Sequence, residues 1–457
     1  MLDNHLLWLI KGGRVLDPSQ GLDQVGNILV KDGKVAWIKK HGAATSPPDN
    51  CHTLDAKGLI VCPGFIDLHC HLREPGYEDK ETIATGTMAA ARGGFTTVCA
   101  MPNTNPPLDN GPTVEFVKRK AQEEGVVRVI PVGCITKGRL GNQMAEMAEL
   151  ARAGVVGFSD DGSPLADSNI MRSALSYSRS LGLPIINHCE DPDLFRGGAM
   201  NEGWVSTRLG LKGIPTTAEA TMASRDIALA ELTGGRLHLA HISTAASLER
   251  VRQAKEKGIR VTCEVTPHHL TMSEDWVLGN RGEGSPFPPL GAGAYNTMAK
   301  VNPPLRSRED VQAMIQGLRE GIIDAIATDH APHSHVDKLC TFDEAAFGIS
   351  VLETALGSLM TLVHGGSLPL PTLIARLTWA PAQLIGSDLG TLKDGSPADI
   401  TILDPDAPWV VDTSQFASKG KNTPLEGATL KGKVMATMVA GTFRYRDDKL
   451  KMEQADG

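Results

Sequence analysis

Hydrophobic positions follow different patterns on the two sides of residue 62. Before it, short apolar runs such as residues 6–10 and 27–30 are separated by turn signals, and Asp32-Gly33 is typical of a β-hairpin turn. After it, short apolar runs alternate with longer segments of helical character, which is the pattern of βα units around a parallel sheet. The sequence therefore predicts an all-β segment followed by an α/β segment.

The α/β segment contains eight apolar runs that we predict to be parallel strands with helices between them. The predicted strands are residues 65–71, 96–101, 127–135, 155–160, 184–189, 237–242, 260–265 and 324–328. The predicted helices are residues 81–91, 114–124, 144–153, 170–181, 218–232, 246–256 and 308–320. Thr216-Thr217-Ala218-Glu219 predicts a capping box at the start of the fifth helix. Together these elements predict a (β/α)8 TIM-like barrel, whose active site lies where the strands end.

After the barrel, the chain returns to β-character. Helical segments at 351–363 and 371–385 are followed by apolar runs at 399–403, 434–439 and 442–445. Because both ends of the chain have β-character, we expect them to form one small β-sandwich domain. The predicted boundaries are residues 1–62 and 386–457 for the two parts of this domain and 63–385 for the barrel. Residues 282–293, which are rich in glycine and proline, are expected to form a surface loop.

Composition narrows the range of functions. The 457 residues are 41% hydrophobic and 21% charged, with a net charge of −8, as expected of a soluble globular protein. The negative charge argues against nucleic acid or an anionic membrane as a partner. The apolar run at residues 6–10 is too short to cross a membrane. The eight cysteines are scattered without a Cys-x-x-Cys pair, which favours free thiols in a reducing cytoplasm.

Polar side chains gather at the ends of the predicted strands. His69 and His71 lie two residues apart, so their imidazoles would face the same side of a strand and could share a metal ion, although two histidines can also share a face by chance. Other strands end in Asp160-Asp161, Asn187-His188, His241 and Asp329-His330. Zinc accepts histidine and aspartate ligands, and a set of this size favours two metal ions bridged by a hydroxide. The strand pattern does not choose between Asp160 and Asp161.

Several motifs together carry a resemblance to a known family. They are residues 63–75, Met101-Pro102-Asn103-Thr104, Phe158-Ser159-Asp160-Asp161-Gly162, Val301-Asn302-Pro303-Pro304-Leu305-Arg306 and Ala327-Thr328-Asp329-His330-Ala331-Pro332-His333. In this order they resemble the dihydroorotases of the bacterial class I type, in the amidohydrolase superfamily. The resemblance covers almost the whole chain. It implies a zinc-dependent enzyme that reversibly cyclises N-carbamoyl-L-aspartate to L-dihydroorotate plus water in pyrimidine (UMP) biosynthesis.

The resemblance also implies the metal ligands. The more buried of two zinc ions would be held by His69, His71 and Asp329, the other by His188 and His241, and Asp161 would bridge them. Asp329 would also move a proton from the attacking hydroxide to the leaving nitrogen. Related hydantoinases and allantoinases usually bridge their metals with a carboxylated lysine, but no lysine occurs between Val155 and Arg179.

By the same resemblance, Arg73, Asn103 and His333 would bind the carboxylate of the substrate, and Asn302 would contact its ring. The planar guanidinium of Arg73 suits bidentate binding, and alternation from His71 would place it on the same face of the strand, the alternative being a surface arginine. Alternation would turn Cys189 and His330 away from the metals. The neighbouring histidines 268 and 269 are expected to be structural.

Two other functions stay open at this point. One is a hydrolase for hydantoin, allantoin or dihydropyrimidine rings, against which the predicted carboxylate ligands argue. The other is a non-catalytic dihydroorotase-like subunit of aspartate transcarbamoylase, against which the complete set of metal ligands argues. A homodimer and a complex with aspartate transcarbamoylase are the partner arrangements we expect. Residues 338–354 depart from the pattern of the family at Ala346 and Ser350-Val351.

Overall fold

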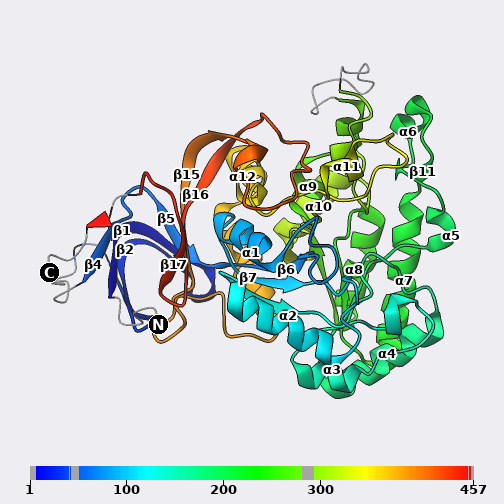
Figure 1. Ribbon diagram of the computed structural model, residues 1–457, viewed down its shortest axis with the longest axis horizontal. Helices are drawn as coiled ribbons and strands as arrows, with labels where there is room; N and C mark the ends of the chain where they lie inside the picture. The colour runs from blue at the N-terminus through cyan, green and yellow to red at the C-terminus, as the bar shows by residue number, and fades with distance from the viewer. Residues whose placement is uncertain (1–6, 41, 43–50, 280–292, 451, 454–457) are drawn as a thin grey trace.

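The computed structural model describes residues 7–40, 42, 51–279, 293–450 and 452–453. A sheet built from both ends of the chain lies on one side of the molecule, and a larger α/β body lies on the other (Figure 1). Most of the expected loop at 282–293 lies outside the described residues. No helix in the part of the chain that the structure describes is long and apolar enough to cross a membrane.

The first sheet contains strands from the N-terminal and C-terminal segments. Its strands are β1 (Trp8–Asp17), β2 (Leu22–Lys31), β3 (Lys34–Lys40), β4 (His52–Asp55), β5 (Ile60–Pro63), β15 (Ile400–Val410), β16 (Thr429–Val439), β17 (Thr442–Arg446) and β18 (Met452–Glu453). The antiparallel pairing of β5 with β15, in which Val61 lies opposite Ile402, joins the two halves. An apolar core of its own, which includes Ile28, Ile400 and Met438, lies within this sheet. The two ends of the chain therefore pair as expected.

The α/β body contains parallel strands. They are β6 (Phe65–Cys70), β7 (Phe95–Ala100), β8 (Arg128–Pro131), β9 (Ile185–Asn187), β12 (Leu237–Leu239), β13 (Val261–Val265) and β14 (Ala325–Ile326), beside a separate short pair, β10 (Met200–Asn201) and β11 (Gly213–Ile214). Backbone hydrogen bonds join β6 to β7 to β8 and β9 to β12 to β13 to β14. Single parallel bridges from Phe158 to Gly133 and to Ile185, and from His330 to Cys70, connect these two sheets at both edges. The parallel pairing thus passes through eight segments and returns to its start.

Helices surround these strands. They are α1 (Ile83–Arg92), α2 (Gly111–Glu124), α3 (Met147–Ala153), α4 (Ser168–Leu181), α5 (Pro192–Phe195), α6 (Trp204–Leu209), α7 (Thr216–Thr233), α8 (Ala245–Glu256), α9 (Pro267–Thr271), α10 (Arg308–Glu320), α11 (His335–Lys338), α12 (Ala355–His364), α13 (Leu370–Leu377) and α14 (Trp379–Leu384). Helices α1, α2, α4, α7 and α8 each pack against the strand that follows them in the chain. Helix α12 packs against β16, which joins the α/β body to the first sheet.

Two local predictions were wrong. Residues 155–160 form no extended strand and contribute a single bridged residue, Phe158, because the chain bends directly afterwards to turn Asp161 inward. The capping box at Thr216 is also absent, since the cap residue of α7 is Pro215, which has no side-chain hydrogen bond. The Glu219 carboxylate instead accepts hydrogen bonds from the backbone N–H groups of Ser243 and Thr244, and so it supports the start of α8.

Candidate active site

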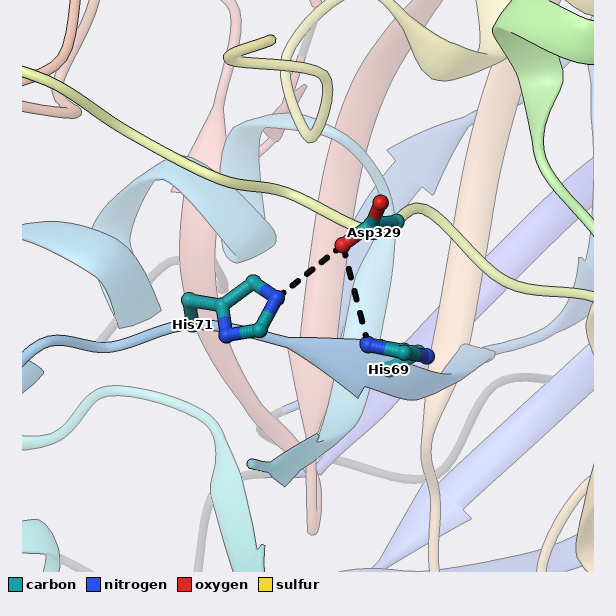
Figure 2. Close-up of side chains that lie close together, drawn as sticks. All are labelled: His69, His71 and Asp329. Atoms are coloured by element: carbon teal, nitrogen blue, oxygen red, sulfur yellow. Dashed lines mark hydrogen bonds and ion pairs between the residues drawn. The ribbon is translucent and has the colours of Figure 1, made fainter. Parts of the chain in front are cut away.

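His69, His71 and Asp329 meet at the carboxyl end of β6 (Figure 2). Oδ1 of Asp329 lies 3.0 Å from Nε2 of His71 and 3.6 Å from Nε2 of His69. The two histidines share a face because side chains alternate along a strand, and their ring centroids are 5.3 Å apart. Asp329 reaches them from the segment after β14. All three side chains are buried.

Asp161 lies between two pairs of histidines. One of its oxygens, Oδ2, is 3.3 Å from Nε2 of His69 and 3.5 Å from Nε2 of His71. The other, Oδ1, is 3.4 Å from Nε2 of His241 and 3.7 Å from Nδ1 of His188. The two ring nitrogens of this second pair are 3.0 Å apart. A carboxylate that faces a different pair of imidazoles with each oxygen has the form of a bridge between two cation sites.

Asp160, the neighbouring candidate, has a different role in the structure. Its carboxylate accepts hydrogen bonds from the backbone N–H groups of Ile135 and Thr136, 2.9 and 3.1 Å away, and from the Thr136 hydroxyl. It therefore anchors the end of the preceding βα unit. Asp161, and not Asp160, therefore lies among the histidines.

His69 and His71 each have a hydrogen-bond partner at Nδ1, so Nε2 of each ring faces the cluster. Nδ1 of His69 lies 2.9 Å from Oε1 of Glu264, and Nδ1 of His71 lies 2.8 Å from Oδ1 of Asn103. With the Nδ1 protons donated there, each Nε2 presents a lone pair toward Asp161 and Asp329. A lone pair facing a carboxylate is repulsive unless a proton or a metal cation lies between them. Nε2 of His69 is buried without a hydrogen-bond partner, so the donor set fits a metal ion.

The charges in the cluster agree with this conclusion. Burial alone would raise the pKa of Asp161 and of Asp329, but the surrounding imidazoles, when they are protonated, hold both pKa values below the usual range. Two ionised carboxylates in a buried space need a positive charge beside them, which either protonated imidazoles or a metal cation held by neutral imidazoles supplies. Two overlapping groups of ligand atoms meet here, one from His69, His71 and Asp329 and one from His69, Asp161 and His241.

The residues predicted to bind the substrate line one cavity of about 480 Å³ next to this cluster. Arg73, Asn103, Asn302 and His333 all contribute to its wall, together with metal-ligand candidates such as His188. The amide of Asn302 donates to Glu190, with Nδ2 3.2 Å from Oε2, and lies 3.2 Å from Nε2 of His188. The cavity therefore joins the predicted metal ligands to the predicted substrate ligands.

Arg73 reaches the cavity by a route that alternation did not predict. Strand β6 ends at Cys70, and Arg73 has a left-handed backbone with φ +62°. Its half-buried guanidinium donates from Nε to the Pro332 carbonyl, 3.3 Å away, and Nη2 lies 3.5 Å from Nε2 of His333. Burial lowers its pKa to about 10, so the group keeps its charge at neutral pH. Arg73 is therefore a half-buried cation in the cavity wall and not a surface arginine.

Backbone strain occurs at three of the predicted site residues. Besides Arg73, His241 has φ +32° and Asp329 has φ +45°. Non-glycine residues rarely adopt such values, and where they occur the surrounding structure must hold them, which is common at active sites. Strand periodicity cannot predict side-chain directions at these positions.

Two carboxylates of the site, Glu264 and Glu190, were not predicted from the sequence. Glu264 on β13 accepts from His69, and its other oxygen, Oε2, lies 3.2 Å from Nε2 of His238. A single carboxylate within the apolar run Val261–Val265 was the available signal. Glu190 follows His188 by two residues and faces the same cavity.

Within the described part of the chain, the side chains that were expected to be structural have no hydrogen bond to the side chains of the histidines and aspartates of the cluster. The Cys189 thiol is buried beside Asp226, with Sγ 3.7 Å from Oδ2. His330 accepts from the backbone N–H of Val351 and lies 3.3 Å from Glu81. Nε2 of His269 lies 3.0 Å from the Pro303 carbonyl. The ring nitrogens of His268 are buried without hydrogen-bond partners.

Solved structures with the same fold define the class of protein. The L-hydantoinase (dihydropyrimidinase) from Arthrobacter aurescens is 27% identical, covers 98% of each chain and has a TM-score of 0.83. The dihydropyrimidinase from Brevibacillus agri NCHU1002 has a TM-score of 0.81 over 98% of this chain and 97% of its own, and at 22% identity it shows the fold alone. This fold, with its buried histidine and aspartate cluster, is that of the amidohydrolases.

Sequence relatives define the family within this class. A "Dihydro-orotase-like" family profile matches residues 58–247. Proteins described as dihydroorotases from Syntrophus aciditrophicus and Geobacter metallireducens are each 49% identical, over 96% of this chain and 99% of their own length. The chain belongs to the dihydroorotase family.

Proposed function

We propose that the chain is a dihydroorotase of the bacterial class I type that reversibly cyclises N-carbamoyl-L-aspartate to L-dihydroorotate plus water in pyrimidine biosynthesis. One observation carries the proposal: a buried cluster of four histidines and two aspartates shares a cavity with Arg73, a half-buried cation that can bind a carboxylate. We also propose that the ring of eight parallel segments is a (β/α)8 barrel spanning residues 63–385. Residues 1–62 and 386–457 then form the small β-sandwich domain.

The proposed cofactor is a pair of zinc ions. His69, His71 and Asp329 would hold one ion, His188 and His241 would hold the other, and Asp161 would serve both sites, as its two oxygens and their different partners favour. Zinc in such a centre lowers the pKa of a bound water toward neutrality and polarises a carbonyl oxygen.

Asp329 is the proposed proton carrier. Its pKa is held below the usual range, so it is ionised at neutral pH and can accept the proton that the attacking water loses. Hydrolysis of dihydroorotate needs this proton on the ring nitrogen that leaves the carbonyl carbon, and Asp329 lines the cavity in which the ring binds. Ring closure uses the same group in reverse by microscopic reversibility.

Arg73, Asn103, Asn302 and His333 are the proposed substrate ligands. A carboxylate placed against Nη2 of Arg73, which lies 3.5 Å from Nε2 of His333, can accept from the guanidinium, and the His333 ring forms the wall beside it. Asn103 orients His71 through Oδ1 and keeps its amide N–H groups for the same carboxylate. Asn302 contacts the ring from the side of His188.

The alternatives are disfavoured for physical reasons. A hydantoin or dihydropyrimidine ring has no carboxylate to pair with the charge of Arg73 in the cavity wall. A non-catalytic subunit of aspartate transcarbamoylase has no need of the charged cluster around Asp161. A homodimer, a complex with aspartate transcarbamoylase and a cytoplasmic location remain predictions.

A paired assay on one preparation tests the proposal. The purified protein is analysed for bound metal and assayed for dihydroorotate hydrolysis before chelation, after chelation and after zinc is returned. We expect about two zinc ions per chain for the proposed centre, loss of turnover on chelation, and recovery with zinc. Hydantoin or dihydrouracil turnover without dihydroorotate turnover would favour the first alternative. A metal-free protein that stays inactive until aspartate transcarbamoylase is added would favour the second.

A further inference from the structure

Lys338, the last residue of α11, is a buried cation that the proposed reaction does not use. Only 1% of its surface is exposed, and its ammonium donates to three backbone carbonyls. Nζ lies 3.1 Å from the oxygens of Thr297 and Lys300 and 2.6 Å from that of Ala346. No ion pair joins it to a carboxylate within the described part of the chain. A lysine without an anionic partner is seldom buried so completely, so a specific role is expected.

The three carbonyls that accept hydrogen bonds from Lys338 belong to two segments that border the substrate cavity. One is residues 297–300, which lead directly into Asn302, and the other ends at Ala346, next to Phe347 and Gly348 in the cavity wall. The Gly348 N–H donates to the Lys300 carbonyl, 3.0 Å away. The Lys300 ammonium lies 4.4 Å from the centre of the Phe347 ring, a cation–π distance. These contacts make the two segments one unit.

This unit also sets the position of His333. Nε2 of His333 donates to the Phe347 carbonyl, 2.8 Å away, one peptide beyond the carbonyl that Lys338 holds. Gly348 packs tightly behind the imidazole, since a Cβ there would lie 3.0 Å from Cδ2 of His333 and 2.7 Å from the Ala331 carbonyl. A movement of residues 346–348 must therefore move His333 relative to Arg73.

Burial lowers the pKa of Lys338 to about 7, but its Nζ donates to three carbonyls, which requires the three N–H groups of the protonated form, so its charge acts in the same place as its hydrogen bonds. Burial, followed by the positive charges of Arg73, Lys338 and Lys80, lowers the pKa of His333 to about 3. The wall around His333 thus has several cations nearby, and a carboxylate placed against it gains more than a neutral group would.

We propose that Lys338 is a positioning residue that fixes the wall formed by His333, Phe347 and Gly348, and through it makes the cavity selective for rings that carry a carboxylate. The proposal rests on the proposed dihydroorotase function and deepens it. It explains why a lysine lies with its charge between backbone carbonyls and not at the surface. If Lys338 served the fold alone, its replacement would lower stability without changing this selectivity.

The test compares Lys338→Met with Lys118→Met. Lys118, which does not line the cavity, also donates to a backbone carbonyl, that of Ala153 2.8 Å away, although it is partly exposed and pairs with Glu115, and it serves as the control. Both holoenzymes are assayed for bound zinc, for KM and kcat with dihydroorotate, and for competitive inhibition by dihydrouracil, which lacks the carboxylate. The ratio of dihydrouracil inhibition constant to dihydroorotate KM measures carboxylate selectivity.

For Lys338→Met we expect about a ten-fold rise in dihydroorotate KM, the change that accompanies loss of one well-placed charge-assisted hydrogen bond. Zinc content, kcat and dihydrouracil inhibition should change little, so the selectivity ratio falls about ten-fold as well. Lys118→Met should match the wild type in all of these measurements. If Lys338→Met fails to fold, Lys338→Gln, which keeps two donors and loses the charge, is assayed in its place.

An unchanged selectivity ratio in a folded Lys338 variant would overturn the proposal and leave the dihydroorotase function intact. Equal losses for dihydroorotate and dihydrouracil would also overturn it, because they indicate a general structural role. A wild-type holoenzyme that does not turn over dihydroorotate would instead remove the proposed function, and this proposal with it.

Discussion

Replacement of Glu264 by glutamine tests whether the residue behind His69 controls metal binding. Glu264 is buried, and its Oε1 accepts a hydrogen bond from Nδ1 of His69 over 2.9 Å. Burial alone would raise its pKa, but bonds from His238 and His69 lower the pKa to about 2, so it is ionised at neutral pH. Its negative charge makes His69 a stronger metal ligand and fixes the imidazole tautomer that presents Nε2 to the cluster.

The expected magnitude follows from the loss of this charge. A hydrogen bond to a charged acceptor contributes about 1.5–3 kcal/mol and one between neutral groups about 0.5–1.5 kcal/mol, so Glu264→Gln loses roughly 1.5 kcal/mol of support for bound metal. This corresponds to about a ten-fold weaker metal affinity, at the lower end of the range of about 10 to 100-fold for such partners.

Metal affinity is measured by competition with a chromophoric chelator. Glu353→Gln is the control, because Glu353 is another glutamate whose carboxylate accepts hydrogen bonds, here from the backbone N–H groups of Ala417 and Ser418, but has no contact with the cluster histidines. We expect the control to keep wild-type affinity. A folded Glu264→Gln protein that binds zinc as tightly as the wild type would refute the reasoning.

Three further predictions concern turnover, substrate binding and stability. Asp329→Asn should retain part of its zinc but lose at least about 100-fold in kcat, because an amide cannot carry the proton, and near-normal turnover would contradict this role. Arg73→Lys should raise the KM for dihydroorotate about ten-fold with kcat little changed, since a point charge loses the bidentate geometry; a change in zinc content alone would make Arg73 structural. Burial raises the pKa of Glu274 from 4.5 to about 7, so the folded state holds this proton more tightly and loses stability as the pH rises through that window. Urea unfolding at pH 5 and pH 8 should therefore show a loss of roughly 2 kcal/mol that is smaller in Glu274→Gln, and an equal loss in both proteins would show that Glu274 does not cause it.

The sequence was sufficient where the signal is local and periodic. The predicted helix at 308–320 matches α10, because its apolar positions recur on one face and Ser307 caps its start. The pair His69 and His71 points to one side because alternation along a regular strand fixes side-chain direction.

Local patterns failed where the backbone leaves regular geometry. Arg73 reaches the cavity through a left-handed turn after β6, and residues 155–160 do not continue as a strand. Glu219 was predicted to cap its own helix, but the capping position belongs to Pro215, and its carboxylate bonds to the start of another helix. Such choices depend on which donors the folded chain brings near, and local sequence does not specify them.

The sequence by itself determined which chemical groups the protein has and the order in which strand ends present them. The strand pattern left Asp160 and Asp161 open, the family resemblance favoured Asp161, and the tertiary structure places Asp161 among the histidines. Only the tertiary structure decided that Glu264 supports His69 and that Lys338 is enclosed by carbonyls of distant segments. The physical reason is distance: hydrogen bonds and ion pairs act over a few ångströms, and the groups that make them here come together only when the strands close into one body.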